Sequence, residues 1–423
     1  MFIQQRMQVK LIRVKGMNFF ENTSHQSFSD LILGENIYID KTSQIANLYK
    51  KHNKFEILIR PWGFGKTLLL DTIKFIFTNG VEHSFIRNLN IATMDMEIPK
   101  QTVLKLDFSD RKIQSAEGFR SFIYSYYKSY LFEQNIQVKL NSELNTYWLT
   151  MHFIRAVART SPTGQIVFLI DNYDQPFLRF LEDRVVNFPA LYNEMLDFYH
   201  ALYDQVEYID WLLLCGETKF ALSTEKHEGL PYISDVSYSD QGTCICGFSQ
   251  GDIRKYYDDF LQDEADANEE TVNIFLGKIT DWYGRYRFTP HNIPVTRPYS
   301  IKSYFSQNAG STALRSFYPV ERFYSFLPKL IAKYGRNHER LLAPNDCGYT
   351  FSDNLDPYNI NMFSLLSQLG FYSFSSITLS KVSSCFQRYR YQSNMVNNEM
   401  NECYQKILAM AEKLRNRGRQ TAS

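Results

Sequence analysis

The chain has 423 residues, of which 44% are hydrophobic and 22% are charged, and its formal net charge is +1. These values exclude a disordered, collagen-like or disulfide-scaffold chain. The balanced charge does not support a general nucleic-acid binder, although local basic patches remain possible. No uncharged apolar run reaches ~18 residues, so we predict no membrane-spanning helix and expect a cytoplasmic protein.

Strand and helix patterns alternate along the first 250 residues. Runs rich in β-branched and aromatic residues predict strands, and apolar residues at helical spacing predict helices. In chain order, the pattern predicts a helix at 43–50, a strand at 55–59, a helix at 68–77, a strand at 102–108, helices at 116–134 and 144–160, a strand at 165–171, a helix at 187–206, and strands at 211–216 and 243–248. This alternation predicts a three-layer α/β core with a mainly parallel sheet.

From residue 249 the chain changes to polar helical sequence, which indicates a domain boundary near residue 250. A final helix is predicted over 397–417, with Gly418 as its stop. We therefore expect an N-terminal extension at 1–24, an α/β core at 25–250, a mostly helical second domain at 251–345 and a C-terminal helical region at 346–423.

The clearest chemical motif is Gly63-Phe64-Gly65-Lys66-Thr67, which lies between a predicted strand and a predicted helix. Glycines let backbone N–H groups close around phosphate oxygens, and a helix N-terminus adds partial positive charge. In such a loop, the lysine binds the β- and γ-phosphates and the threonine hydroxyl binds Mg²⁺. The full P-loop pattern would place its first glycine at position 60, where this chain has Arg60.

A second motif is the apolar strand that ends in Asp171. A P-loop site needs a carboxylate at the end of a neighbouring strand to hold Mg²⁺, directly or through water. Taken alone, Asp171 is equally well explained as a turn residue. The two motifs together, in this order, favour a nucleotide site.

These motifs resemble those of the bacterial AAA-ATPase-like family. The segment 38–42 resembles its Y-x-V-D-K-T box, and 60–70 resembles R-P-R-R-F-G-K-S-L-L-L, which also has Arg-Pro in place of the first glycine. Further boxes are similar at 169–176 (L-I-D-E-Y-D-x-P), 215–219 (T-G-x-x-R), 246–249 (F-G-F-T), 282–288 (W-Y-D-G-Y-R-F) and 298–301 (N-P-W-S-V). The resemblance spans roughly residues 25 to 370.

The resemblance implies a RecA/AAA-type core that binds ATP and Mg²⁺. Residues expected at the nucleotide are Arg60, Gly63, Phe64, Gly65, Lys66, Thr67, Leu68, Lys219 and Arg287; the expected metal ligands are Thr67 and Asp171; and the catalytic candidates are Lys66, Asp171, Asn172 and Asp174. Arg287 is equally well explained as a structural arginine among aromatic residues.

Three departures from the family pattern weaken the expected hydrolysis. The acid after Asp171 is replaced by Asn172, which can bind water but cannot accept its proton. Lys219 replaces an arginine and loses its bidentate geometry. Trp62 and Gly63 replace two arginines near the phosphates. Asp174 is a possible substitute base.

We therefore expect an ATP-dependent switch with slow or impaired hydrolysis. The alternative is a degenerate ATPase scaffold that binds a protein partner, possibly a host-directed bacterial effector secreted into a host cell. Many family members carry a nuclease-like domain with a Glu-x-Lys motif, and no such pattern follows residue 340. Cys244 and Cys246 lie two apart on the predicted strand at 243–248, where buried cysteines are a better explanation than metal ligands.

Overall fold

The computed structural model describes residues 27–34, 36–110, 112–224, 229–288, 293–307, 313–319, 325–334, 354–378, 388–391 and 395–421. At its centre lies a five-stranded sheet in the order β2-β3-β4-β1-β5. All of its neighbouring strands run parallel. The strands are β1 Phe55–Ile59, β2 Thr102–Asp107, β3 Ile166–Asp171, β4 Ile209–Gly216 and β5 Ser234–Asp235.

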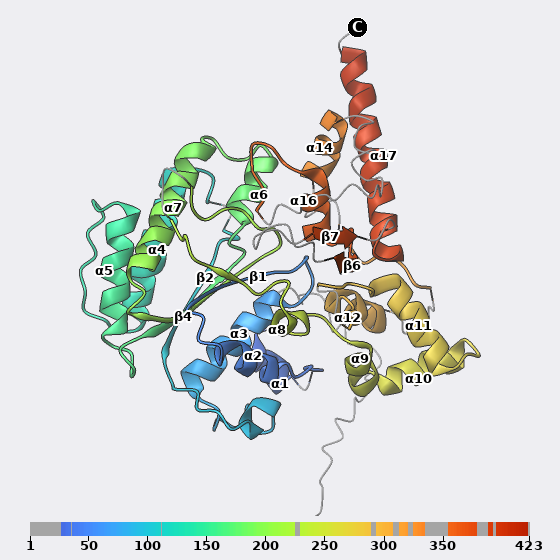
Figure 1. Ribbon diagram of the computed structural model, residues 1–423, viewed down its shortest axis with the longest axis horizontal. Coiled ribbons are helices and arrows are strands. Elements are labelled where there is room, and N and C mark those ends of the chain that lie inside the picture. The colour runs from blue at the N-terminus through green and yellow to red at the C-terminus, as the bar shows by residue number, and fades with distance from the viewer. Residues whose placement is uncertain are drawn as a thin grey trace, which may run out of the picture.

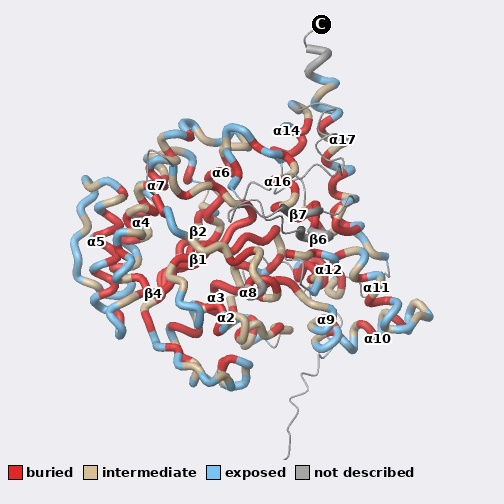
Figure 2. The backbone as a smooth tube through the Cα atoms, viewed as in Figure 1, coloured by how far each residue is buried: buried red, intermediate tan, exposed pale blue. Residues whose placement is uncertain are grey.

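Helices cover both faces of this sheet (Figure 1). On one side lie α1 Phe28–Leu33, α2 Thr42–Tyr49 and α3 Lys66–Asn79; on the other lie α4 Ala116–Glu133, α5 Thr146–Ala158 and α7 Phe188–Asp204. Short segments η2 Asn90–Thr93 and α6 Gln175–Leu181 complete the core. Strands β1 and β3 are buried along their whole length, as Figure 2 shows for the sheet. This burial explains their largely apolar sequences, in which Glu56 of β1 and the terminal Asp171 of β3 are the exceptions. The predicted three-layer α/β class is confirmed.

The helices after residue 249 are polar on the outside, and their buried apolar residues form a second cluster. These helices comprise α9 Gln250–Tyr256, α10 Asp258–Ala267, α11 Val272–Tyr283 and α12 Pro298–Gln307. Ile253, Ile279 and Tyr304 are buried together there, and Ile39 from the N-terminal side of the core joins them. An ion pair between Lys41 and Asp252, 2.6 Å apart, ties α9 to the segment before α2.

The C-terminal segments pack back onto the core instead. They comprise α14 Phe326–Tyr334, α16 Met362–Gln368, an antiparallel pair β6 Phe374–Thr378 and β7 Arg388–Tyr391, and α17 Asn398–Thr421. Leu365, Met400 and Ile407 belong to the same buried cluster as the sheet. The sequence analysis expected helices here but not the strand pair. Helix α17 continues through Gly418 to Thr421, so the predicted stop at Gly418 is wrong. A glycine favours the end of a helix but does not require one.

The predicted strand at 243–248 is wrong. A short helix, α8 Asp240–Thr243, ends there, and the fifth strand is the two-residue β5 instead. Gly247 has φ +89°. This turn directs Phe248 into a bridge with Thr296 rather than into the sheet. Cys244 and Cys246 therefore do not share a strand face.

Among the described segments, no group of three or more His, Cys, Asp or Glu side chains is arranged to hold a metal ion. None of the helices in those segments combines the length and the hydropathy that a bilayer-spanning segment requires.

Buried Glu56 on β1 predicts a pH-dependent stability. Its carboxylate accepts hydrogen bonds from Trp211 Nε1 at 2.8 Å and Asn53 Nδ2 at 3.2 Å, but burial raises the pKa of Glu56 from 4.5 to about 7. As pH rises, the unfolded chain loses the Glu56 proton near pH 4.5, whereas the folded chain keeps it until about pH 7. The free energy of unfolding therefore falls between these two pH values and is then constant. Between pH 5 and 8 this group should remove about 2–3 kcal/mol of stability.

Urea unfolding of the parent and Glu56→Gln at pH 5 and pH 8 checks this. From pH 5 to pH 8, the free energy of unfolding of Glu56→Gln should rise by about 2–3 kcal/mol relative to that of the parent. An equal difference in stability at both pH values would contradict it.

Candidate functional site

The loop 60–65 connects the end of β1 to the start of α3, at the carboxyl edge of the parallel sheet. Gly63 and Gly65 both have positive φ, +80° and +89°. A Cβ on Gly65 would meet nothing within 4 Å, so this glycine faces open space. A Cβ on Gly63 would lie 3.0 Å from Tyr299 Cβ and 3.2 Å from Arg297 Cδ. The loop is therefore open at Gly65 and closely covered at Gly63.

Lys66 is the first residue of α3, and its side chain is enclosed by the loop and 7% exposed. Its ammonium donates to the carbonyl oxygens of Arg60 at 2.7 Å and Pro61 at 3.2 Å. An ammonium has three N–H donors, so one donor is not used by these two carbonyls. Lys66 is thus held at the N-terminus of α3, where an anion would also meet the positive end of the helix.

Thr67 and Asp171 meet although 104 positions separate them in the sequence. The Thr67 hydroxyl donates to Asp171 Oδ2 at 2.7 Å. Burial raises the pKa of Asp171, and nearby Asp107 adds to this effect, whereas Thr67 and Lys66 oppose it. A hydroxyl and a carboxylate oxygen are ligands that Mg²⁺ accepts, and a cation here would favour the ionised form of Asp171.

Asn172 follows Asp171 in the left-handed backbone conformation, with φ +53°. Asparagine tolerates this conformation better than most residues. Its Nδ2 donates to Asp107 Oδ1 at 2.9 Å. The sequence analysis did not select Asp107, which lies at the end of β2.

Asp174 is fully enclosed. Its Oδ2 accepts from Glu217 N at 3.0 Å, from Thr218 N at 2.7 Å and from the Thr218 hydroxyl at 2.6 Å. Its Oδ1 is buried without a hydrogen-bond partner. Burial raises the pKa of Asp174, against these hydrogen bonds. The carboxylate therefore holds the turn after β4 and does not face the P-loop opening.

Four of the expected nucleotide residues make contacts within the protein. Arg60 is fully buried, donates to the carbonyl oxygens of Ile59, Ser237 and Gly242, and stacks on Phe288 with 3.8 Å from Cζ to the ring centre. Lys219 pairs with Asp235 on β5, 2.7 Å apart. Phe64 is buried against Tyr286 and Phe288. Leu68 is half-buried and packs against the core.

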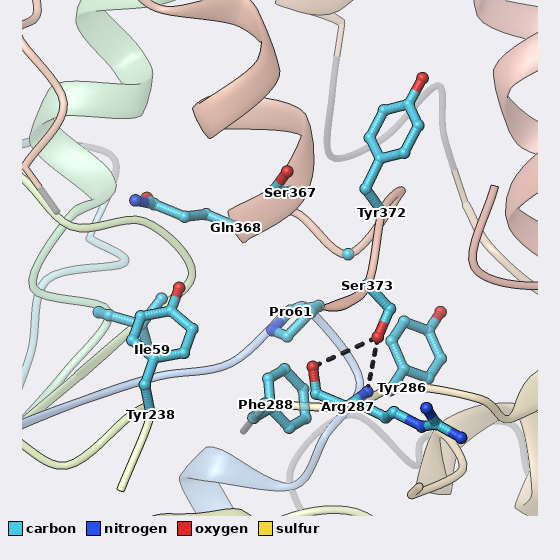
Figure 3. Close-up of a pocket in the computed structure, with 11 residues that line it drawn as sticks. Ile59, Pro61, Tyr238, Tyr286, Arg287, Phe288, Ser367, Gln368, Tyr372 and Ser373 are labelled. Carbon is cyan, nitrogen blue, oxygen red and sulfur yellow. Dashed lines mark hydrogen bonds between the residues drawn. The ribbon is translucent and has the colours of Figure 1, made fainter. Parts of the chain in front are cut away.

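Arg287 lies beside a small pocket between β1 and α16, and its guanidinium points away from Pro61 (Figure 3). Its backbone N–H donates to Ser373 Oγ at 2.7 Å. The pocket has a volume of about 20 Å³, enough for about one water molecule. Neither Lys66 nor Thr67 lines it, so this pocket is separate from the side chains expected at the phosphates.

The structure adds two residues that sequence reasoning missed. Arg297 packs on Gly63 and forms a fully buried ion pair with Glu399 of α17, with 3.0 Å between Nη1 and Oε2. Tyr299 N donates to Gly63 O at 3.1 Å. The only sequence signal was the resemblance at 298–301, next to Arg297. The P-loop thus contacts α12 and, through Arg297, α17.

Comparison with known proteins supports the resemblance. Residues 23–224, just under half of the chain, match the AAA-ATPase-like family, described as predicted AAA-ATPases. An uncharacterized protein encoded in the vnfD 5′ region of Azotobacter chroococcum is 24% identical over 271 residues, which is 62% of this chain. The alignment covers 48% of that relative, so the chain spans about half its length. No solved structure matches the chain.

Proposed function

We propose that this chain, whose residues 23–224 match the predicted AAA-ATPases, is an ATP-binding P-loop protein that acts as a nucleotide-dependent switch. The observation that carries the proposal is the convergence of Lys66, Thr67 and Asp171 beside the exposed Gly65. The backbone of 63–67 and Lys66 would hold the phosphates, and Thr67 and Asp171 would hold Mg²⁺. The metal would neutralise charge on the phosphate oxygens.

The contacts of Gly63 support the switch. Phosphate binding would draw the Lys66 ammonium away from the carbonyl oxygens of Arg60 and Pro61. The same loop is held by Tyr299 and Arg297 at the start of α12. A change in the loop would therefore reach the helical part, which we treat as a second domain beyond residue 250 and as a candidate surface for a protein partner. Asn172 cannot accept a proton, so hydrolysis needs a carboxylate from elsewhere.

Calorimetric titration of the full chain with ATP and Mg²⁺ tests the proposal. Lys66→Ala should weaken ATP binding at least about 100-fold, because it removes a buried charge that pairs with phosphate. Lys74→Ala is the matched control, since Lys74 lies on the same helix and is exposed. It should bind ATP like the parent. The proposal fails if the parent binds no ATP or if Lys66→Ala binds as well as the parent.

A further inference from the structure

Two polar residues stand side by side at the carboxyl edge of the sheet, next to the Mg²⁺ ligands. In the parallel pairing of β2 with β3, Asp107 lies opposite Asp171. Asn172, one residue further, donates its Nδ2 to Asp107 Oδ1. Position 172 is where the family resemblance places an acid, and here the carboxylate stands on the neighbouring strand. In this chain the amide thus stands at position 172 and the carboxylate at the end of β2.

Asp107 has acceptor capacity to spare. Its Oδ1 accepts from Asn172 and from Ser109 N at 2.8 Å, and its Oδ2 accepts from the Ser109 hydroxyl at 2.9 Å. A carboxylate offers about four acceptor positions, so Oδ2 keeps one. The residue is only half-buried.

Three other carboxylates near this edge are engaged. Asp71 on α3 pairs with Lys105, 2.5 Å apart. Asp171 accepts from Thr67 and is the expected Mg²⁺ ligand. Asp174 is enclosed beneath the turn after β4. Asp107 therefore combines a spare acceptor position with partial exposure, opposite the expected Mg²⁺ ligand Asp171.

We propose that Asp107 is the general base for ATP hydrolysis and that Asn172 is the residue that positions it, an inference that rests on the ATP-binding function proposed above. In the step, one O–H bond of water breaks and its proton passes to the Asp107 carboxylate. The water oxygen forms a bond to the γ-phosphorus. The bond from that phosphorus to the β,γ-bridging oxygen breaks, its electron pair leaves with ADP, and inorganic phosphate is the second product.

The test compares the full-length parent with Asp107→Asn, which keeps the size of the side chain and an acceptor for Asn172. ATP turnover should fall at least about 100-fold, in line with the loss of a general base. ATP affinity should stay or rise a few-fold while ADP affinity is unchanged, because removing a carboxylate near the γ-phosphate relieves repulsion. Asp110→Asn, in the same loop after β2, is the matched control and should turn over ATP like the parent.

The outcomes are separable because binding and turnover are measured independently. If the parent binds no ATP, the proposed function fails and this inference fails with it. If the parent binds ATP but does not hydrolyse it, or if Asp107→Asn stays within tenfold of the parental rate, only the assignment of Asp107 is overturned. Loss of ATP binding in Asp107→Asn at an unchanged melting temperature would also overturn it. If Asp107→Asn is unfolded, Asp107→Ser is judged by the same criteria.

Discussion

Replacing Glu399 by alanine is expected to lower the free energy of unfolding by about 3–5 kcal/mol, the usual penalty for removing one partner of a buried ion pair. Glu399 and Arg297 are both 0% exposed. The Glu399 carboxylate also accepts from the Ser300 hydroxyl at 2.8 Å and from Phe317 N at 2.9 Å. Alanine would leave the Arg297 charge and these two donors without their acceptor.

The magnitude is checked by equilibrium unfolding in urea. Glu402→Ala is the matched control on the same helix, since Glu402 is 39% exposed and pairs with the exposed Lys406. It should change stability by less than about 0.5 kcal/mol. The double variant Arg297→Met/Glu399→Met should recover the part of the loss that comes from the lone Arg297 charge, although the Ser300 hydroxyl and Phe317 N–H stay without an acceptor. If the free energy of unfolding of Glu399→Ala lies within about 1 kcal/mol of the parent's, roughly fivefold in the folding equilibrium, this account is contradicted.

The same ion pair bears on the loop 60–65. Arg297 carbons lie 3.2–3.4 Å from the Cβ position of Gly63, so the pair fixes the arginine against the P-loop turn. Helix α17 is also held near α11, because Asn397 caps α17 and donates to Gly284 O at 2.8 Å. The C-terminal helix therefore contributes to the shape of a loop more than 300 residues earlier in the chain.

The features that sequence predicted best are local ones. The strand, loop and helix over 55–77 and the strand ending at Asp171 are confirmed, because burial on both faces gives strands a continuous apolar run. Strand β5 has two residues, too few to show any periodicity. The segment 243–248 has strand composition, but the positive φ of Gly247 overrides that preference.

The parts of the site that could not be predicted depend on distant pairings. Asp107 stands next to Asn172 only because β2 and β3 pair in one register, which composition does not specify. Arg297 and Glu399 are 102 positions apart. Asp174 was a reasonable candidate from its spacing, yet the turn after β4 folds over it. Sequence thus predicted the strand, glycine loop and helix, whereas tertiary structure decides which carboxylates lie beside that loop.

Replacing Asp174 by alanine should lower the free energy of unfolding by about 3 kcal/mol or more. Its Oδ2 accepts from two backbone N–H groups and one hydroxyl in the turn 217–218, all of them buried. Each buried donor left without an acceptor costs about 1–3 kcal/mol. Asp174→Asn keeps an acceptor oxygen there and should lose only about 1 kcal/mol. Urea unfolding of both variants measures this difference.

The two Asp174 variants also separate a structural role from a catalytic one. If Asp174 only holds the turn, Asp174→Asn should retain ATP affinity and turnover, because Asp107 and the P-loop are unchanged by it. A catalytic Asp174 gives the opposite pattern, with parental stability and a loss of turnover of 100-fold or more. The enclosure of Asp174 favours the first result, since a base must reach the water from which it takes a proton. The same assay on Asp107→Asn and Asp174→Asn therefore decides which strand end carries the base.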